Sequence, residues 1–205
     1  MATQQKSLHA TARDTAHVQQ ARAAYRQLLV TLDVRRLTVV DAAGVNLAMT
    51  RLYGRAPRGV RVMGRVPQHD GPTVTMLGTR GVQGLQAMMT VEGATDADVF
   101  RTSVTRVRGP TLRPGDIVVM DTLRAHKAVG GQQALARRGA RLLYLPSCSP
   151  DLSPIEPCWS NVKTALCTAK ARTRNAVDTA ITHTLPTITG TDAQGWFIHC
   201  DYALQ

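Results

Sequence analysis

Residues 117–121 of the chain read Ile-Val-Val-Met-Asp, and residues 37–41 read Leu-Thr-Val-Val-Asp. A short, continuous apolar run of this kind is typical of a central strand that is buried on both faces of its sheet. In α/β folds, side chains at the carboxyl ends of such strands form the functional site. The two stretches therefore predict that Asp41 and Asp121 meet at one edge of a sheet. The alternative is that each aspartate merely begins a turn.

The remaining elements are predicted from periodicity and from residues that break helices and strands. Apolar residues at helical spacing indicate a helix within residues 1–34, either packed on the core or leading into it. The other expected elements are strands over 73–77, 85–91 and 141–145, and helices over 96–108, 127–138, 154–170, 173–187 and 191–199. The early strands form an antiparallel hairpin and the later ones connect through helices. This order predicts an α/β fold with a mixed five-stranded sheet and helices on both faces.

Small residues set the expected ends of the strands. Ala42-Ala43-Gly44 should stop the first strand directly after Asp41. Gly78, Gly81 and Gly84 should form the connection of the hairpin, because glycine is typical of turns between strands. Both expectations depend on local propensity alone.

The charge of the chain indicates a polyanionic partner. The 205 residues, enough for one domain with a small appendage, include 25 Lys and Arg against 14 Asp and Glu, a formal net charge of +11. Arginine predominates and suits bidentate contacts with phosphate. Nucleic acid is the expected partner, although a basic protein can also have no specific one.

Several classes are excluded by what the sequence lacks. The longest apolar runs span a few residues, far short of the ~20 that a membrane helix requires, so no membrane partner is expected. The N-terminus has no apolar segment typical of a secretory signal. The four cysteines show neither C-x-x-C spacing nor histidine partners at zinc-finger distance, so we interpret them as reduced, packed thiols in a cytoplasmic protein.

A cluster of arginines without any acid occupies residues 51–65. Glycine and proline interrupt this stretch, which favours an irregular basic loop over a helix. One interpretation is a solvated surface loop, and the other is a loop that contacts phosphate. The candidate DNA-binding arginines are Arg51, Arg55, Arg58, Arg61 and Arg65.

Glu156 has two interpretations. Ser153, Pro154 and Glu156 fit the N-cap, N1 and N3 positions of a capping box, which alone would explain the glutamate. The helix that follows, however, has its apolar stripe at other positions, and Glu156 shares its flank with Lys163. From that flank, Glu156 could lean over the sheet edge and join Asp41 and Asp121.

Three clustered carboxylates would repel one another by roughly 4 kcal/mol per pair at ~4 Å and an effective dielectric near 20. They therefore need a proton or a cation. All-oxygen ligands favour Mg²⁺ or Mn²⁺, and two such ions can activate a water or a 3′-hydroxyl and stabilise the leaving oxygen of a phosphodiester. A basic surface around an acidic centre is the charge pattern expected of an enzyme that acts on nucleic acid backbones.

These residues also carry a family resemblance. Residues 121–127, Asp-Thr-Leu-Arg-Ala-His-Lys, and 142–146, Leu-Leu-Tyr-Leu-Pro, followed by 149–156, Ser-Pro-Asp-Leu-Ser-Pro-Ile-Glu, and by Trp159, closely resemble DDE transposases. The branch is that of the bacterial insertion-sequence relatives of the mariner superfamily. The 34 residues between Asp121 and Glu156 fit that branch. Further upstream, the segments 44–46, 53–57 and 91–95 resemble its first catalytic segment, and the resemblance runs from about Lys6 to the C-terminus.

The resemblance implies an RNase H-like DDE catalytic domain over residues 35–205, preceded by a linker or helical extension over residues 1–34. It implies DNA transposition, with metal-dependent hydrolysis at the transposon ends and strand transfer into target DNA. Asp41, Asp121 and Glu156 take the catalytic and metal-binding positions, with two Mg²⁺ or Mn²⁺ ions. The pairing of two ends makes a homodimer plausible. The implied location is the bacterial cytoplasm, in association with the nucleoid.

Other residues are assigned to DNA by the same resemblance. His126 and Lys127 follow the second aspartate as they do in the family, and we expect them to help place DNA or to orient the site. Lys163 is a further candidate for DNA binding. His126 could equally be a structural histidine. The chain departs from the family at Ala42, where an acid is usual, at Thr122, where asparagine is usual, and at Ser147-Cys148, where Pro-Tyr is common. The side chain of residue 42 is expected to face away from the metals, because side chains alternate along a strand.

Three functions remain open from the sequence. The first is a transposase catalytic core that begins at the linker and lacks the helix-turn-helix domains with which full-length relatives begin. The second is a catalytically inert, basic DNA-binding remnant of such an enzyme. The third, a different RNase H-like nuclease such as a junction or hybrid nuclease, is disfavoured by the motif after Pro146.

Overall fold

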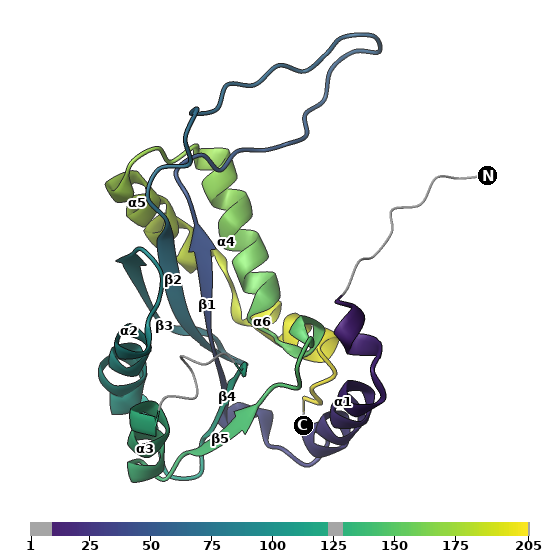
Figure 1. The fold of residues 1–205 in the computed structure, drawn as a ribbon, viewed down its shortest axis with the longest axis vertical. Coiled ribbons are helices and arrows are strands. Elements are labelled where there is room, and N and C mark those ends of the chain that lie inside the picture. Colours follow the sequence, from purple (N-terminus) through teal and green to yellow (C-terminus); the bar gives the residue numbers. More distant parts are fainter. Residues whose placement is uncertain (1–9, 123–128, 205) are drawn as a thin grey trace, which may run out of the picture.

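A five-stranded mixed sheet forms the centre of the protein (Figure 1). The computed structural model describes residues 10–122 and 129–204. The strand order is β3-β2-β1-β4-β5, in which β1 pairs antiparallel with β2, β2 antiparallel with β3, and β1 and β5 parallel with β4. The strands are β1 (Leu37–Val45), β2 (Val74–Gly81), β3 (Gly84–Glu92), β4 (Ile117–Met120) and β5 (Arg141–Tyr144).

Helices cover both faces of this sheet. The α-helices are α1 (Ala16–Leu29), α2 (Ala97–Thr102), α3 (Val129–Arg137), α4 (Glu156–Ala169), α5 (Arg174–Thr184) and α6 (Gly190–His199). The predicted helix over 96–108 is α2 followed by one π-helical stretch, Ser103–Arg108. Short 3₁₀ helices lie at Thr11–Asp14, Val34–Arg36, Gly109–Thr111, Pro150–Leu152 and Leu185–Thr187.

Alternation of side chains along the strands divides the core into two layers. Val39 and Ala43 of β1 pack in the larger cluster with residues of α1, α4, α5 and α6. Val40 packs in the smaller cluster with Phe100 of α2 and Leu135 of α3. Because both faces of β1 and β4 are buried, their sequences are continuously apolar, as expected of central strands. The predicted mixed sheet with helices on both faces is confirmed.

The two strands before the hairpin turn are longer than the sequence predicts. β1 does not stop at Ala42-Ala43-Gly44 but continues to Val45, because these residues pair with β2 as far as Val74. Likewise, β2 runs through Gly78 to Gly81 instead of turning there. Ladder hydrogen bonds to a neighbouring strand thus outweigh the low strand propensity of Ala and Gly.

The capping box predicted at the start of α4 is absent. The helix begins at Glu156 itself, with Ile155 as its N-cap residue and no side-chain cap. Ser153 contributes only its carbonyl oxygen, which accepts a hydrogen bond from the Glu156 amide at 3.1 Å. Helix capping therefore does not account for the glutamate at this position.

Residues 46–73 form a long irregular loop that projects from the end of the sheet (Figure 1). Its base is fastened: the Leu47 amide donates to the Asp70 carbonyl at 2.9 Å, and Arg172 donates to the carbonyls of Leu47 and Met49 at 2.6 and 2.9 Å. Residues 51–69 beyond this base are exposed. The prediction of an irregular basic loop is confirmed.

Two further points concern membrane helices and cysteines within residues 10–122 and 129–204, which the structure describes. Among those residues, no helix is both long enough and apolar enough to cross a membrane. All four cysteines are free thiols. Cys158 and Cys200 are buried in the core, whereas Cys148 and Cys167 are partly exposed. The interpretation of the cysteines as packed thiols therefore fits two of the four.

Candidate functional site

Asp41 and Asp121 come from adjacent parallel strands and point to the same face of the sheet. The register pairs Val39 of β1 with Val119 of β4, and each aspartate lies two residues beyond its valine. Both valines pack in the cluster on the α4 side, and side chains at i and i+2 share a face. The sheet topology thus brings together two residues that lie 80 positions apart in the sequence.

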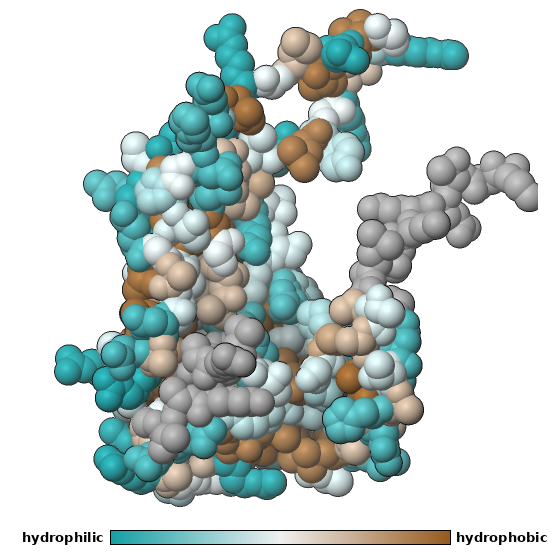
Figure 2. Space-filling view, viewed as in Figure 1, coloured by the Kyte–Doolittle hydropathy of each residue, from teal (hydrophilic) through white to brown (hydrophobic). Residues whose placement is uncertain are grey.

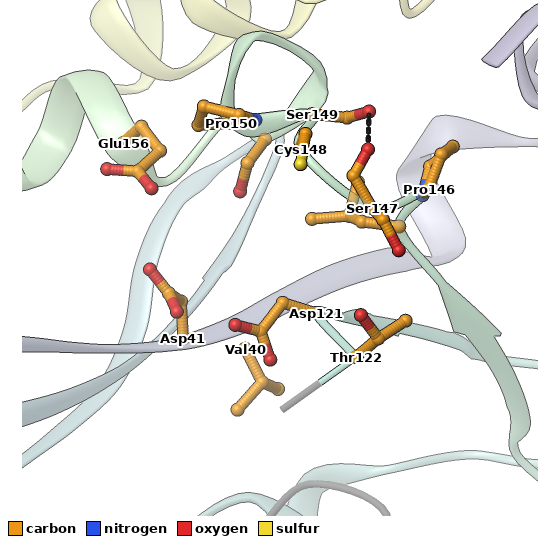
Figure 3. Close-up of a pocket in the computed structure, with 12 residues that line it drawn as sticks. Val40, Asp41, Asp121, Thr122, Pro146, Ser147, Cys148, Ser149, Pro150 and Glu156 are labelled. Atoms are coloured by element: carbon orange, nitrogen blue, oxygen red, sulfur yellow. Dashed lines mark hydrogen bonds between the residues drawn. The ribbon is translucent and has the colours of Figure 1, made fainter. Parts of the chain in front are cut away.

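Glu156 completes the group from the first turn of α4. Together with Asp41 and Asp121 it lines one cavity of about 290 Å³. Figure 3 shows the three carboxyl groups facing this space, with Glu156 opposite the two aspartates. The three carboxylates singled out in the sequence therefore share one cavity.

Ala42 lies on the opposite side of the sheet from this cavity. It packs against the smaller core cluster, beside residues of α2 and α3. The expectation that residue 42 faces away from the carboxylates is confirmed. An acid at this position would be directed into that apolar layer instead of the cavity.

Burial and mutual repulsion both raise the pKa values of carboxyl groups in the cavity. Burial raises the pKa of Asp41 to about 6, and the charges of Glu156 and Asp121 add to the increase. The pKa of Glu156 is also raised, mainly by burial and further by Asp121, against the opposing charge of Lys163. The cavity therefore disfavours bare negative charge and favours a bound proton or cation.

Trp159 holds one oxygen of Asp41 in place. Its indole N–H donates to Asp41 Oδ2 at 2.9 Å, and its side chain is only 2% exposed. Trp159 lies one turn after Glu156 on α4, so one helix supplies a carboxylate to the cavity and orients another. The sequence places Trp159 in the apolar stripe of this helix but does not reveal the hydrogen bond, which links residues 118 positions apart.

Gly78 of β2 makes room for the Trp159 ring. It is paired with Asp41 in the β1–β2 ladder, and a Cβ atom there would lie 2.5 Å from the ring. The sequence predicts Gly78 as part of a turn. Its position within a strand, where glycine is unfavourable, is a signal of close approach by another group that could have identified it.

The loop between β5 and α4 forms the rim of the cavity. Cys148 adopts a left-handed backbone conformation (φ 53°), which turns the chain sharply between Ser147 and Ser149. The Ser149 hydroxyl donates to the Ser147 carbonyl across this turn at 3.0 Å (Figure 3). The rim contains Pro146, Ser147, Cys148, Ser149, Pro150 and Ser153.

The three carboxylates are ligands that suit a hard divalent cation, but they do not converge on one point. Carboxylate oxygens are the ligands that Mg²⁺ and Mn²⁺ prefer. Within residues 10–122 and 129–204, however, no three side chains of the ligating types converge closely enough to hold an ion as they stand. A shared ion would therefore need these carboxylates to lie closer together.

Lys163 follows Glu156 along the partly exposed face of α4. It lines a second cavity with Gly44, Asn46 and Thr73, beside the end of β1. A third cavity, near the end of α4, is lined by Arg51, Arg65 and Lys170 among others. Basic groups thus follow α4 from the carboxylate cavity to the projecting loop.

The loop itself presents arginines and apolar side chains side by side. Arg51 donates to the Thr168 hydroxyl at 3.0 Å, which fixes it at the base of the loop. The other four arginines of the loop are exposed, and hydrophilic and hydrophobic groups are interspersed along the projecting segment in Figure 2. The predicted DNA contacts His126 and Lys127 lie outside the described residues.

One family model and several solved structures match this chain. The family model described as DDE superfamily endonuclease matches residues 36–178. No curated protein matches the sequence. Among solved structures, a pre-cleavage Mos1 transpososome has a TM-score of 0.78 at 12% identity, covering 98% of this chain and 65% of that one.

Two further structures are similar. The Mos1 mariner paired-end complex with Mn has a TM-score of 0.78 at 13% identity, over 97% of this chain and 64% of that one. The catalytic domain of Mos1 mariner transposase has a TM-score of 0.66 at 11% identity, over 96% of this chain and 93% of that one. The chain thus spans slightly less than two thirds of the longer relatives. At these identities the likeness concerns the fold, and the RNase H-like sheet is confirmed.

Proposed function

The chain belongs to the DDE superfamily endonucleases, and from this membership we propose that it is the catalytic core of a DNA transposase. The reaction would be metal-dependent hydrolysis of phosphodiester bonds followed by strand transfer. One observation carries the proposal: Asp41, Asp121 and Glu156, from two central strands and one helix, face a single cavity. The residue resemblance further supports an origin in a bacterial insertion sequence, with a cytoplasmic, nucleoid-associated location.

Asp41, Asp121 and Glu156 are the proposed ligands of two Mg²⁺ or Mn²⁺ ions. The raised pKa values of Asp41 and Glu156 support this assignment, because the cavity favours a cation beside its carboxylates. Mos1 paired-end complexes have been solved with Mn and with Mg. Bound there, such ions would supply activation of a water or 3′-hydroxyl and stabilisation of the leaving oxygen. Trp159 would keep Asp41 Oδ2 fixed and leave the other oxygen to bind metal.

DNA is the proposed partner, as transposon ends and as target. The support is the net charge of +11 and the basic groups that follow α4 away from the carboxylates. Lys163 would contact phosphate nearer the carboxylates, and Arg51 and Arg65 would do so at the far end of α4. Arg55, Arg58 and Arg61 would extend the contact along the loop. His126 and Lys127 are proposed as further DNA contacts on the resemblance alone. Such contacts give affinity that depends on salt and reads little sequence.

A homodimer is proposed for the assembled state. The projecting loop exposes large apolar side chains, including Leu52 at 84%, Tyr53 at 91% and Met63 at 82%, as expected of a surface that another protein covers. Paired-end complexes of Mos1 give the precedent for assembly on two DNA ends. Sedimentation of the protein with and without DNA tests this: a monomer under both conditions would contradict it.

Nicking of supercoiled plasmid tests the catalytic proposal. Wild-type protein should nick in Mn²⁺ or Mg²⁺ and not in EDTA. Asp121→Asn and Glu156→Gln should lose nicking while keeping DNA affinity, because each removes one charge without changing shape. Asp98→Asn is the matched control, since Asp98 is 82% exposed on α2, and this helix packs on the face of the sheet opposite the cavity.

The competing function is a catalytically inert protein that binds DNA through its basic surface. It predicts salt-dependent DNA binding without nicking under any divalent metal. A crystal soaked in Mn²⁺ separates the two further. Anomalous density bound by Asp41, Asp121 and Glu156 supports catalysis, and density elsewhere or none argues for the inert protein.

A further inference from the structure

The cavity-lining segment 146–156 is anchored from behind by the N-terminal helix. Most of its residues face the cavity, but Asp151 is turned away and meets α1. Arg22 of α1 donates to both carboxylate oxygens of Asp151, through NH1 at 3.0 Å and NH2 at 2.6 Å. Arg13 adds a third hydrogen bond to this carboxylate at 3.0 Å. This fork-shaped contact fixes direction as well as distance.

Arg22 depends on Asp151 as its charged partner. Its side chain is 2% exposed, and a buried guanidinium without its partner is strongly unfavourable. The hydrogen bond with Asp151 raises the pKa of Arg22. Burial acts to raise the pKa of Asp151, but the hydrogen bond and charge of Arg22, with the charge of Arg13 and a backbone hydrogen bond, leave that pKa lowered. Both groups thus remain charged and paired.

A second contact ties the neighbouring residue to the same helix. The Tyr202 hydroxyl donates to the Leu152 carbonyl at 3.1 Å and is 2.9 Å from the Tyr25 hydroxyl of α1. All three residues are almost fully buried. Asp151 and Leu152 are therefore held by α1 and the C-terminal segment, a few residues before Glu156.

We propose that Arg22 is a positioning residue, which holds Asp151 so that the segment 146–156 keeps Glu156 aimed into the cavity. The proposal rests on the catalytic role proposed above for Glu156. It assigns Asp151 an anchoring role instead of metal binding, although it is an acid in the motif segment. It also gives α1 a role in the activity, because this helix holds the segment 146–156 that lines the cavity.

Hydrogen exchange tests the anchor without relying on activity. The amides of Leu152, Ser153 and Glu156 are bonded within the segment, to the carbonyls of Ser149, Pro150 and Ser153. In Arg22→Lys and in Asp151→Asn, exchange over residues 146–156 should rise about tenfold or more, whereas exchange in β1 and β4 should not change. Lys keeps the positive charge of Arg22, and Asn keeps the shape and one acceptor oxygen of Asp151. Thermal unfolding checks that each variant is folded under the conditions of the exchange experiment.

Arg26→Gln is the matched control on the same helix. Arg26 lies one turn after Arg22 and pairs with Asp201 at 2.8 Å, but this exposed pair does not reach the cavity-lining segment. This variant should leave exchange over 146–156 at the wild-type level. Unchanged exchange in Arg22→Lys and Asp151→Asn, or an equal rise in Arg26→Gln, would overturn the anchor.

The Mn²⁺ affinity and the nicking rate provide the second test. Mutation of groups that orient metal ligands typically lowers metal affinity or activity 10–100-fold. We expect a fall of about this size in Mn²⁺ affinity and in the nicking rate at saturating DNA for Arg22→Lys, with DNA affinity unchanged. If the wild-type protein does not nick, the catalytic proposal fails by itself, and the exchange data still decide whether Arg22 anchors the segment. If it nicks and Arg22→Lys matches it in rate and Mn²⁺ affinity, the positioning role is wrong.

Discussion

The indole N–H of Trp159 donates a 2.9 Å hydrogen bond to Oδ2 of Asp41. This bond connects α4 to β1 across the cavity wall and makes the orientation of one carboxylate depend on the packing of the helix that carries Glu156. A displacement of α4 would thus move two of the three proposed ligands together. The following predictions begin from this relationship.

Trp159→Phe should weaken the site while keeping the aromatic packing. A hydrogen bond to a charged group contributes about 1.5–3 kcal/mol, so the nicking rate should fall roughly tenfold or more. The bond from Trp159 lowers the pKa of Asp41, so its loss should raise that pKa and move the acid limb of the pH–rate profile to higher pH. Trp196→Phe on α6 is the control, and an identical profile for both variants would refute the role of Trp159.

Gly78→Ala should disturb the same contact from the sheet side. The new Cβ would lie 2.5 Å from the Trp159 ring, and overpacking of this kind costs typically about 1–3 kcal/mol. We expect a lower melting temperature together with weaker Mn²⁺ binding. Gly44→Ala in β1 is the control, because its Cβ would meet only Thr73 at an ordinary 3.8 Å. Equal losses in the two variants would mean that glycine is needed at both positions for reasons other than Trp159.

Asp41→Asn should stabilise the metal-free protein at neutral pH. The pKa of Asp41 is about 6 when folded, against 3.8 for an ordinary aspartate. The folded state therefore binds the proton more tightly, and the wild-type free energy of unfolding falls as pH rises from about 4 to 6. Above pH 6 the ionised carboxylate costs up to about 3 kcal/mol, which the amide avoids.

Thermal unfolding in EDTA measures this effect. The gain in Asp41→Asn should be present at pH 7.5 and vanish near pH 3.5, where both proteins are uncharged at this position. Mn²⁺ should reverse the order, because it stabilises only the protein that binds it. A variant that is less stable than wild type at pH 7.5 in EDTA would contradict the raised pKa.

Replacement of Arg58, Arg61 and Arg65 by Gln should weaken DNA binding and reduce its salt dependence. Removing the charge at one phosphate lowers the slope of log K against log salt by about 0.9, so the slope of the triple variant should be smaller by up to roughly 2.7. Three other arginines, Arg113, Arg137 and Arg138, are exposed and provide a control with the same change in charge. They lie at or beside the end of α3, which is at the opposite end of the molecule from the loop (Figure 1). An equal weakening in the control would show that net charge, and not the loop, governs affinity.

Much of the site could be predicted from the sequence because its signals are local. Apolar runs that end in Asp41 and Asp121 identify the central strands, and the motif through Glu156 identifies the third carboxylate. The irregular loop follows from its glycines and prolines. In each case the residues that carry the signal are neighbours in the chain.

Other features depended on partners that are distant in the chain. The ends of β1 and β2 are set by their pairing with each other, which overrode the weak strand propensity of Ala42–Gly44 and Gly78. The capping box at Ser153 fits the local sequence and yet does not form. The N-cap residue of α4 is Ile155 and not Ser153.

The sequence by itself thus determined the order of elements, the basic character of the surface and the three acids that approach one another. Only the tertiary structure decided how those acids are held: Asp41 by Trp159, 118 positions away, and the segment before Glu156 by Arg22, through Asp151, 129 positions away. Periodicity and propensity encode which residues are buried and in which kind of element. They do not encode which buried donor meets which acceptor, because that depends on how helices pack against the sheet.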